Sequence, residues 1–143
     1  MSMTEPMKLS PNDVSYPESL SNLFGSLLPP DIWVIGNVAL LSEKAVGFCG
    51  SRKASERGLE VAADCARQLS EVGVIVVSGY APGVDMASHV AALKNGGRTI
   101  IVLPEGINHF RIKKAVKILW DWERVLVVSQ FPRDAIWRPD RAM

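Results

Sequence analysis

Four short apolar runs, separated by helix-like patterns, constrain this chain more than any other feature. The runs are mostly β-branched and free of polar residues, and they cover residues 45–49, 74–77, 99–103 and 125–128. Such runs are typical of strands buried on both faces of a parallel sheet. The stretches between them carry apolar residues at helical spacing, as βαβ units require. We therefore predict an α/β fold, built as a Rossmann-like, doubly wound, mostly parallel sheet.

The residues before the first run predict a small addition to this sheet. Residues 1–15 are polar and aperiodic, so we expect a flexible leader there. Residues 16–143 are then a single Rossmann-like domain, with an appendage at 16–44 and the sheet core at 45–143.

Three further elements are predicted from local patterns. Apolar residues at helical spacing after Pro17 predict a short helix in the appendage. The runs 32–35 and 38–41 flank Gly36-Asn37 and predict a small hairpin or two edge strands. In the core, the third helical pattern extends from about Lys113 to Trp122.

Composition bounds the class of protein. The chain has 143 residues, of which 48% are hydrophobic, and a net charge of +1. This excludes a protein coated with basic residues, although residues 106–143 carry eight basic and four acidic side chains. A local patch of this kind can bind phosphate, and the alternative is a solvated face. No apolar run is long enough to cross a bilayer and no signal-peptide core is present, so we expect a cytoplasmic protein with no membrane partner. The two cysteines, Cys49 and Cys65, are expected to be small buried residues.

Three strand ends carry residues suited to binding an anion. The first is Gly50-Ser51-Arg52, where glycine allows close approach, serine offers a hydroxyl and arginine can fork onto a phosphate. The second is Ser78–His89, a small-residue turn that opens a helix, whose N-terminus favours negative charge. The third is the turn Leu103–Gly106. Since the carboxyl ends of parallel strands lie at one edge of the sheet, the three turns should converge on one crevice.

Other motifs are weaker or missing. Neither G-x-G-x-x-G nor the P-loop pattern occurs, which disfavours a nicotinamide dehydrogenase or a P-loop NTPase, and we expect no cofactor. Asp85 and His89 share a helix face and are either ligand contacts or local stabilisers of the helix start. No catalytic triad, carboxylate pair or metal cluster stands out. Tryptophans are more often core residues than base-stacking platforms, and we expect that role for all four.

Taken together, these residues resemble the bacterial DNA-processing protein A (DprA/Smf) family. Its signature is similar to G-S-R, then S-G-x-A-x-G-x-D-x-x-x-H, then a T-I-x-V-L strand with a glycine turn, then S-E-x-P. In this chain these are residues 50–52, 78–89, 99–106 and 129–132, with Gln130 in place of the glutamate. A Tyr-Pro pair before the sheet, Tyr16-Pro17, also matches.

The resemblance implies a protein that binds single-stranded DNA, protects incoming DNA and assists its loading onto the RecA recombinase during natural transformation or recombination. It implies no enzymatic activity and leaves a homodimer open. By position, the nucleic-acid or phosphate contacts are expected at Gly50, Ser51, Arg52, Ser78, Gly79, Gly83, Asp85, Gly106 and Lys113. A second set of candidates is His89, Arg111 and Lys114.

Other interpretations stay open at this point. The family continues into an R-N-R segment, whereas this chain stops at Met143, so it is expected to be a truncated or divergent relative or a fragment. The same crevice could serve a nucleotide-binding enzyme or sensor, of which the lysine-decarboxylase-like phosphoribohydrolases are the nearest type. The chain could also be a structural or partner-binding fragment.

Overall fold

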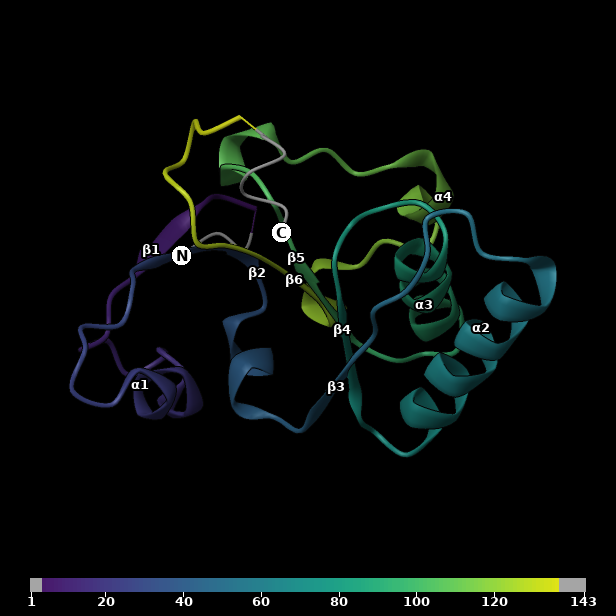
Figure 1. The fold of residues 1–143 in the computed structure, drawn as a ribbon, viewed down its shortest axis with the longest axis horizontal. Coiled ribbons are helices and arrows are strands. Elements are labelled where there is room, and N and C mark those ends of the chain that lie inside the picture. Colours follow the sequence, from purple (N-terminus) through teal and green to yellow (C-terminus); the bar gives the residue numbers. More distant parts are fainter. Residues whose placement is uncertain (1–3, 137–143) are drawn as a thin grey trace.

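A computed structural model describes residues 4–136 and has one mixed sheet with helices on both faces (Figure 1). The strands are β1 (Met7–Leu9), β2 (Ile32–Gly36), β3 (Ala45–Gly47), β4 (Ile75–Ser78), β5 (Thr99–Val102) and β6 (Val125–Ser129). Their order across the sheet is β1-β2-β6-β5-β4-β3. The pairs β3–β4, β4–β5 and β5–β6 are parallel, while β1–β2 and β2–β6 are antiparallel. The predicted α/β class and mostly parallel sheet are confirmed.

Three helices cover one face of this sheet. They are α2 (Glu56–Glu71), α3 (Val84–Lys94) and the short α4 (Lys114–Lys117), while α1 (Glu18–Phe24) lies on the opposite side (Figure 1). Three 3-10 turns complete the chain: η1 (Val38–Ser42), η2 (Ile107–His109) and η3 (Trp122–Arg124). No helix in the described part of the chain has the length and apolar character that a bilayer crossing needs.

Helix α2 shows how the local sequence sets these elements. Ser55 caps its N-terminus, where Oγ accepts a hydrogen bond from Gly58 N at 3.1 Å. Ala62 and Ala66 are buried, and Ala66 packs closely with Val76 of β4 and with two alanines of α3, Ala91 and Ala92. After the helix ends, Gly73 takes a positive φ of 78° and turns the chain into β4.

The N-terminal part differs from the prediction in two ways. First, Met7–Leu9 is not a flexible leader but an edge strand, with Leu9 only 4% exposed. Its alternation of apolar, polar and apolar residues is too short to give a periodic signal. Second, β2 is part of the main sheet, paired with β1 and β6, so the appendage is not separate from the core.

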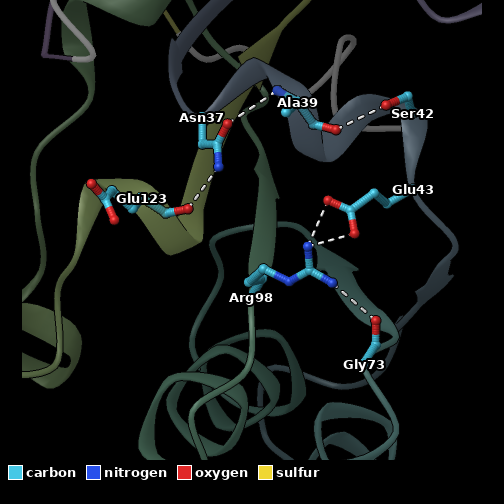
Figure 2. A network of polar contacts seen from close by, with 7 residues as sticks. All are labelled: Asn37, Ala39, Ser42, Glu43, Gly73, Arg98 and Glu123. Carbon is cyan, nitrogen blue, oxygen red and sulfur yellow. Dashed lines mark hydrogen bonds and ion pairs between the residues drawn. The ribbon is translucent and has the colours of Figure 1, made fainter.

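The prediction of a hairpin or two edge strands is wrong, because the first run forms β2 but the second run is not a strand. Gly36 takes a φ of 115° and lies so close to the Val125 carbonyl that no side chain would fit. Asn37 then caps η1, because its Oδ1 accepts from Ala39 N at 3.1 Å, and its Nδ2 donates to Glu123 O at 2.8 Å (Figure 2). The second apolar run therefore forms a 3-10 turn.

Three smaller expectations also fail. Strand β3 is exposed at the edge of the sheet rather than buried on both faces. The third helix is a single turn, α4, because the chain bends to pack Trp120 and Trp122 against Phe110. Both cysteines are exposed.

The amino-terminal ends of the parallel strands are joined by an arginine clamp. Arg98 Nη1 donates to both carboxylate oxygens of Glu43, at 2.5 and 2.6 Å, and Nη2 donates to Gly73 O at 3.0 Å (Figure 2). The clamp therefore ties the segment before β3 to the residues before β4 and β5. Figure 2 shows it close to the Asn37 turn.

Candidate functional site

The candidate site is a pocket at the carboxyl ends of the parallel strands, where open α/β sheets hold their ligands. Loops at 48–54, 79–83 and 103–113 border it, following β3, β4 and β5. Its volume is about 580 Å³, which is in the usual range for small-ligand sites. The lining combines cations, carboxylates, aromatic rings and loop residues: Arg52, Gly79, Tyr80, Ala81, Pro82, Asp85, Val102, Leu103, Pro104, Glu105, His109, Phe110, Arg111, Lys113, Gln130 and Phe131.

The first two loops interlock because both carry glycine at the contact. Val84 N donates to Ser51 O at 3.2 Å. A Cβ atom at Gly50 would lie 2.7 Å from Val84 Cγ2. Gly83 has a φ of 86°, and a Cβ there would overlap the Ser51 carbonyl and the Arg52 backbone. These glycines therefore shape the loops, and neither lines the pocket itself.

Asp85 holds the second loop from within. Its Oδ2 accepts a hydrogen bond from Ala81 N at 3.2 Å, and its Oδ1 lies 2.8 Å from the Ser78 hydroxyl. A Cβ at Gly79 would stand 2.6 Å from Oδ2, so the turn must carry glycine to close around the carboxylate. Asp85 reaches the pocket, but both of its oxygens already have partners in the loop.

His89 is a buried support beneath this loop. It is fully buried, with Nε2 2.6 Å from Gly79 O and Nδ1 2.6 Å from Thr99 Oγ1. Because Gly79 O can only accept, we assign the proton of the neutral ring to Nε2. Nδ1 then accepts from the Thr99 hydroxyl, which also lies 3.1 Å from a second acceptor, Val76 O. Burial lowers the pKa of His89 below its ordinary value.

The third loop packs on the chain that follows β6. Gly106 N donates to Ala135 O at 2.7 Å, and Asn108 N donates to Arg133 O at 3.0 Å. A Cβ at Gly106 would overlap the carbonyls of Pro132 and Arg133. Gly106 is thus required by close backbone approach and, like Gly50 and Gly83, acts on the shape of the loop.

The predicted site residues fall into four groups. Arg52, Gly79, Asp85, Arg111 and Lys113 line the pocket, and Gly50, Ser51, Gly83 and Gly106 shape its loops. Ser78 and His89 are buried, at 4% and 0% exposure, with their polar atoms engaged internally, so neither is available for direct ligand contact. Lys114 is exposed on α4 and does not line the pocket.

Sequence reasoning missed the aromatic part of the site. Tyr80, Phe110 and Phe131 line the pocket, and Tyr80 and Phe110 have ring centroids 5.4 Å apart. Tyr80 occupies a variable position of the motif, so its place just after a strand was the only sequence feature that pointed to a role in the site. The tryptophans behave as expected where they are described: Trp33, Trp120 and Trp122 pack against the core, while Trp137 lies outside the described residues.

The charges around the pocket suit an anionic ligand. Among the described residues Arg52 has no hydrogen bond or ion pair, and it is exposed at the pocket rim. Arg111 and Lys113 flank it from the third loop. Two other basic residues of this segment are engaged in the fold: Arg124 caps the end of α3 through Leu93 O and Gly97 O, both at 3.0 Å, and Arg133 stands 4.9 Å from the ring centroid of Trp33. Arg138 and Arg141 lie outside the described residues.

Comparisons with known proteins identify the family. Residues 8–143 match the family described as DNA recombination-mediator protein A. The chain belongs to this family. DNA processing protein DprA of Streptococcus pneumoniae is 38% identical over 121 residues, which is 83% of this chain and 42% of that protein. A putative DNA processing protein DprA of Mycobacterium tuberculosis is 42% identical over 82 residues, which is 56% of this chain and 21% of that protein.

Solved structures of DNA processing protein A share the fold. The X-ray structure of the Streptococcus pneumoniae protein superposes with a TM-score of 0.78 at 31% identity, covering 98% of this chain and 49% of that one. The Helicobacter pylori protein, described for its single-stranded DNA binding mode, superposes with a TM-score of 0.77 at 21% identity, covering 99% of this chain and 63% of that one. The chain thus spans about half the length of these relatives.

Proposed function

We propose that this member of the recombination-mediator family binds single-stranded DNA in the pocket between its three loops. The observation that carries the proposal is the lining itself, in which the exposed Arg52 and Lys113 stand at the rim and the partly buried Tyr80 and Phe131 lie beside them. Cations can neutralise a phosphate backbone, and aromatic faces can stack unpaired bases without reading their sequence. Membership of the family, whose description is that of a recombination mediator, supports the same ligand.

The remaining parts of the proposal concern the setting. We expect the bound strand to be protected in the cytoplasm and passed to a RecA-type recombinase, by binding alone and without cleavage of a bond. The two histidines support a binding function: His89 is buried, and His109 is engaged with Asp134 O at 2.9 Å through Nε2. A homodimer would add a second pocket and raise the avidity for a long strand.

The test is fluorescence anisotropy of a labelled oligothymidine titrated with the chain at two salt concentrations. We expect the affinity to fall as the salt concentration rises, and we expect duplex DNA of equal length to compete poorly. Matched titrations with Arg52→Ala and Lys114→Ala locate the site, because Arg52 lines the pocket and Lys114 does not. Equal losses in the two variants, or no binding, would contradict the proposal.

One observation favours a second candidate. The pocket volume of about 580 Å³ also suits a single nucleotide. Adenosine triphosphate is therefore included as a competitor. Tight nucleotide binding without any binding of the oligonucleotide would replace the proposed function with a nucleotide sensor or enzyme, and no binding of either would leave a structural role.

A further inference from the structure

Tyr80 joins the second loop to the third through four separate interactions. Lys113 N donates to the Tyr80 hydroxyl at 2.8 Å, and this hydroxyl donates to Arg111 O at 3.0 Å. Lys113 Nζ donates to Tyr80 O at 2.6 Å and stands 4.5 Å from the centroid of the ring. The backbone of residues 111–113 and the Lys113 ammonium are therefore both positioned by one tyrosine.

The ring of Tyr80 is itself held in place from below. Its centroid lies 5.4 Å from that of Phe110 and 6.5 Å, edge-on, from that of His89. Phe110 in turn packs against Trp120, with centroids 5.7 Å apart. This half-buried setting raises the pKa of Tyr80 above its ordinary value, so the phenol stays protonated and remains a donor to Arg111 O.

Lys113 keeps free donor capacity in this arrangement. An ammonium group has three N–H donors, and Tyr80 O takes one of them. Within the described residues, Nζ has no other hydrogen-bond partner, and the side chain is exposed at the pocket rim. A lysine that is ordered only when a ligand binds loses rotamer freedom at that moment, whereas one that is already ordered does not.

We propose that Tyr80 is a positioning residue, which orients Lys113 at the pocket rim before a strand arrives and so strengthens its contact with phosphate. This inference rests on the proposed function and adds a residue that touches no phosphate itself. The hydroxyl is the group to test, because it bonds both the Lys113 N–H and the Arg111 carbonyl two residues earlier, while the ring supplies packing and the ammonium contact.

The test is a double-mutant cycle on oligothymidine affinity with Tyr80→Phe and Lys113→Ala. Tyr80→Phe retains the ring and removes only the hydroxyl. We expect it to weaken binding about threefold in the wild-type background, a part of the cost of ordering one long side chain, because the ring and the Tyr80 carbonyl still contact the ammonium. In the Lys113→Ala background the same change should weaken binding less than twofold.

A second readout separates positioning from general weakening. The affinity for a single strand falls as the salt concentration rises, and the loss of one phosphate contact reduces the magnitude of this slope, log affinity against log salt, by about 0.7. Lys113→Ala should show this decrease and Tyr80→Phe a part of it. Tyr16→Phe is the matched control, since Tyr16 is buried elsewhere and donates to Pro30 O at 2.6 Å, so it should leave both affinity and slope unchanged.

Amide hydrogen exchange checks the contact without DNA. The Lys113 amide should exchange faster in Tyr80→Phe, with the unfolding midpoint reporting that the variant is folded. Unchanged exchange, or equal losses of affinity in the two backgrounds of the cycle, would overturn the inference. If the wild-type chain binds no oligonucleotide, the proposed function fails and this inference fails with it. If Lys113→Ala weakens binding and Tyr80→Phe does not, the inference alone fails.

Discussion

Arg52, at the carboxyl ends of the parallel strands, differs from the two arginines at their amino-terminal ends. At the amino-terminal ends, Arg98 and Arg124 are about one quarter exposed, at 28% and 27%, and donate to Glu43, Asp121 and backbone carbonyls. At the carboxyl ends, Arg111 also donates to backbone carbonyls, but Arg52 is exposed and has no hydrogen bond or ion pair among the described residues. The number of basic residues in a segment therefore says little about ligand binding, because an arginine committed to the fold has few donors left for a phosphate.

Individual glycines at the two ends also differ. Gly83, at the carboxyl ends, is pressed against the backbone of the neighbouring loop, whereas Gly73 and Gly96, which lead into β4 and β5, have open space where a side chain would stand. Gly83 therefore serves close packing as well as backbone conformation, while Gly73 and Gly96 serve conformation alone. Close packing is not confined to the site, because Gly36 and Gly97, near the starts of β6 and β5, are also tightly packed.

The largest expected effect tests the glycine contrast. Gly83→Ala should lower the free energy of unfolding by about 3 kcal/mol or more, because the left-handed backbone and the overlap with the Ser51 carbonyl both penalise a Cβ. At Gly96 the backbone φ is 75°, but no atom lies within 4 Å of an added Cβ, so Gly96→Ala should lower the free energy of unfolding by about 1 kcal/mol. Urea unfolding measures both values. Equal losses of stability in the two variants would contradict the difference between Gly83 and Gly96.

The arginine contrast predicts that affinity and stability separate. Arg52→Ala should weaken oligothymidine binding about tenfold, the value of one charge-assisted hydrogen bond, and leave the unfolding midpoint unchanged. Arg98→Ala should lower the free energy of unfolding by about 1 kcal/mol, since its carboxylate partner is partly solvated, and leave affinity unchanged. Fluorescence anisotropy gives the affinity of each variant, and urea unfolding gives its stability. A loss of affinity in Arg98→Ala would contradict the separation of a binding role for Arg52 from a structural role for Arg98.

Because His89 is buried beneath the site, we expect the stability of the folded chain to depend on pH. Burial lowers its pKa from 6.5, so below pH 6.5 the unfolded chain binds a proton that the folded chain does not. Stability is therefore lost as pH falls from 6.5 towards the lowered pKa of the folded state, by no more than about 1.4 kcal/mol per pH unit. His89→Gln should remove this slope. His109→Gln is the matched control and should keep it, because it leaves His89 in place. A slope that persists in His89→Gln would assign it to other groups.

The smallest effect uses the two exposed cysteines as reporters. Cys49 directly precedes the Gly50 loop, while Cys65 lies within α2, away from the pocket lining. Saturating oligothymidine should slow the reaction of Cys49 with a thiol reagent about twofold to threefold by covering it, and should not change Cys65. The variants Cys65→Ser and Cys49→Ser separate the two rates. Protection of Cys65 instead would place the strand on α2.

The sequence predicted best what depends on repeated patterns. The runs at 74–77, 99–103 and 125–128 became the central parallel strands, and the three glycine turns did converge on one pocket. These signals are strong because each is repeated at the same point of successive βαβ units.

What the sequence could not predict depends on partners far along the chain. Met7–Leu9 is a strand only because β2 lies beside it, and Val38–Ser42 turns into η1 only because Gly36 meets Val125. In the site, the motif marked Ser78 and His89 correctly as special but could not tell a buried support from a ligand contact. That distinction needs burial, which follows from the packing of α3 against the sheet.

The position of β6 has a consequence for folding during synthesis. It is the last strand of the described chain, yet it lies between β2 and β5 in the middle of the sheet. Earlier strands on its two sides cannot be joined until residues 125–129 have left the ribosome, so the contacts that close the sheet have large sequence separation and form late. Nascent chains arrested before Val125 should remain protease-sensitive, and resistance should appear abruptly once β6 has emerged. Resistance before that point would show that the two halves fold separately.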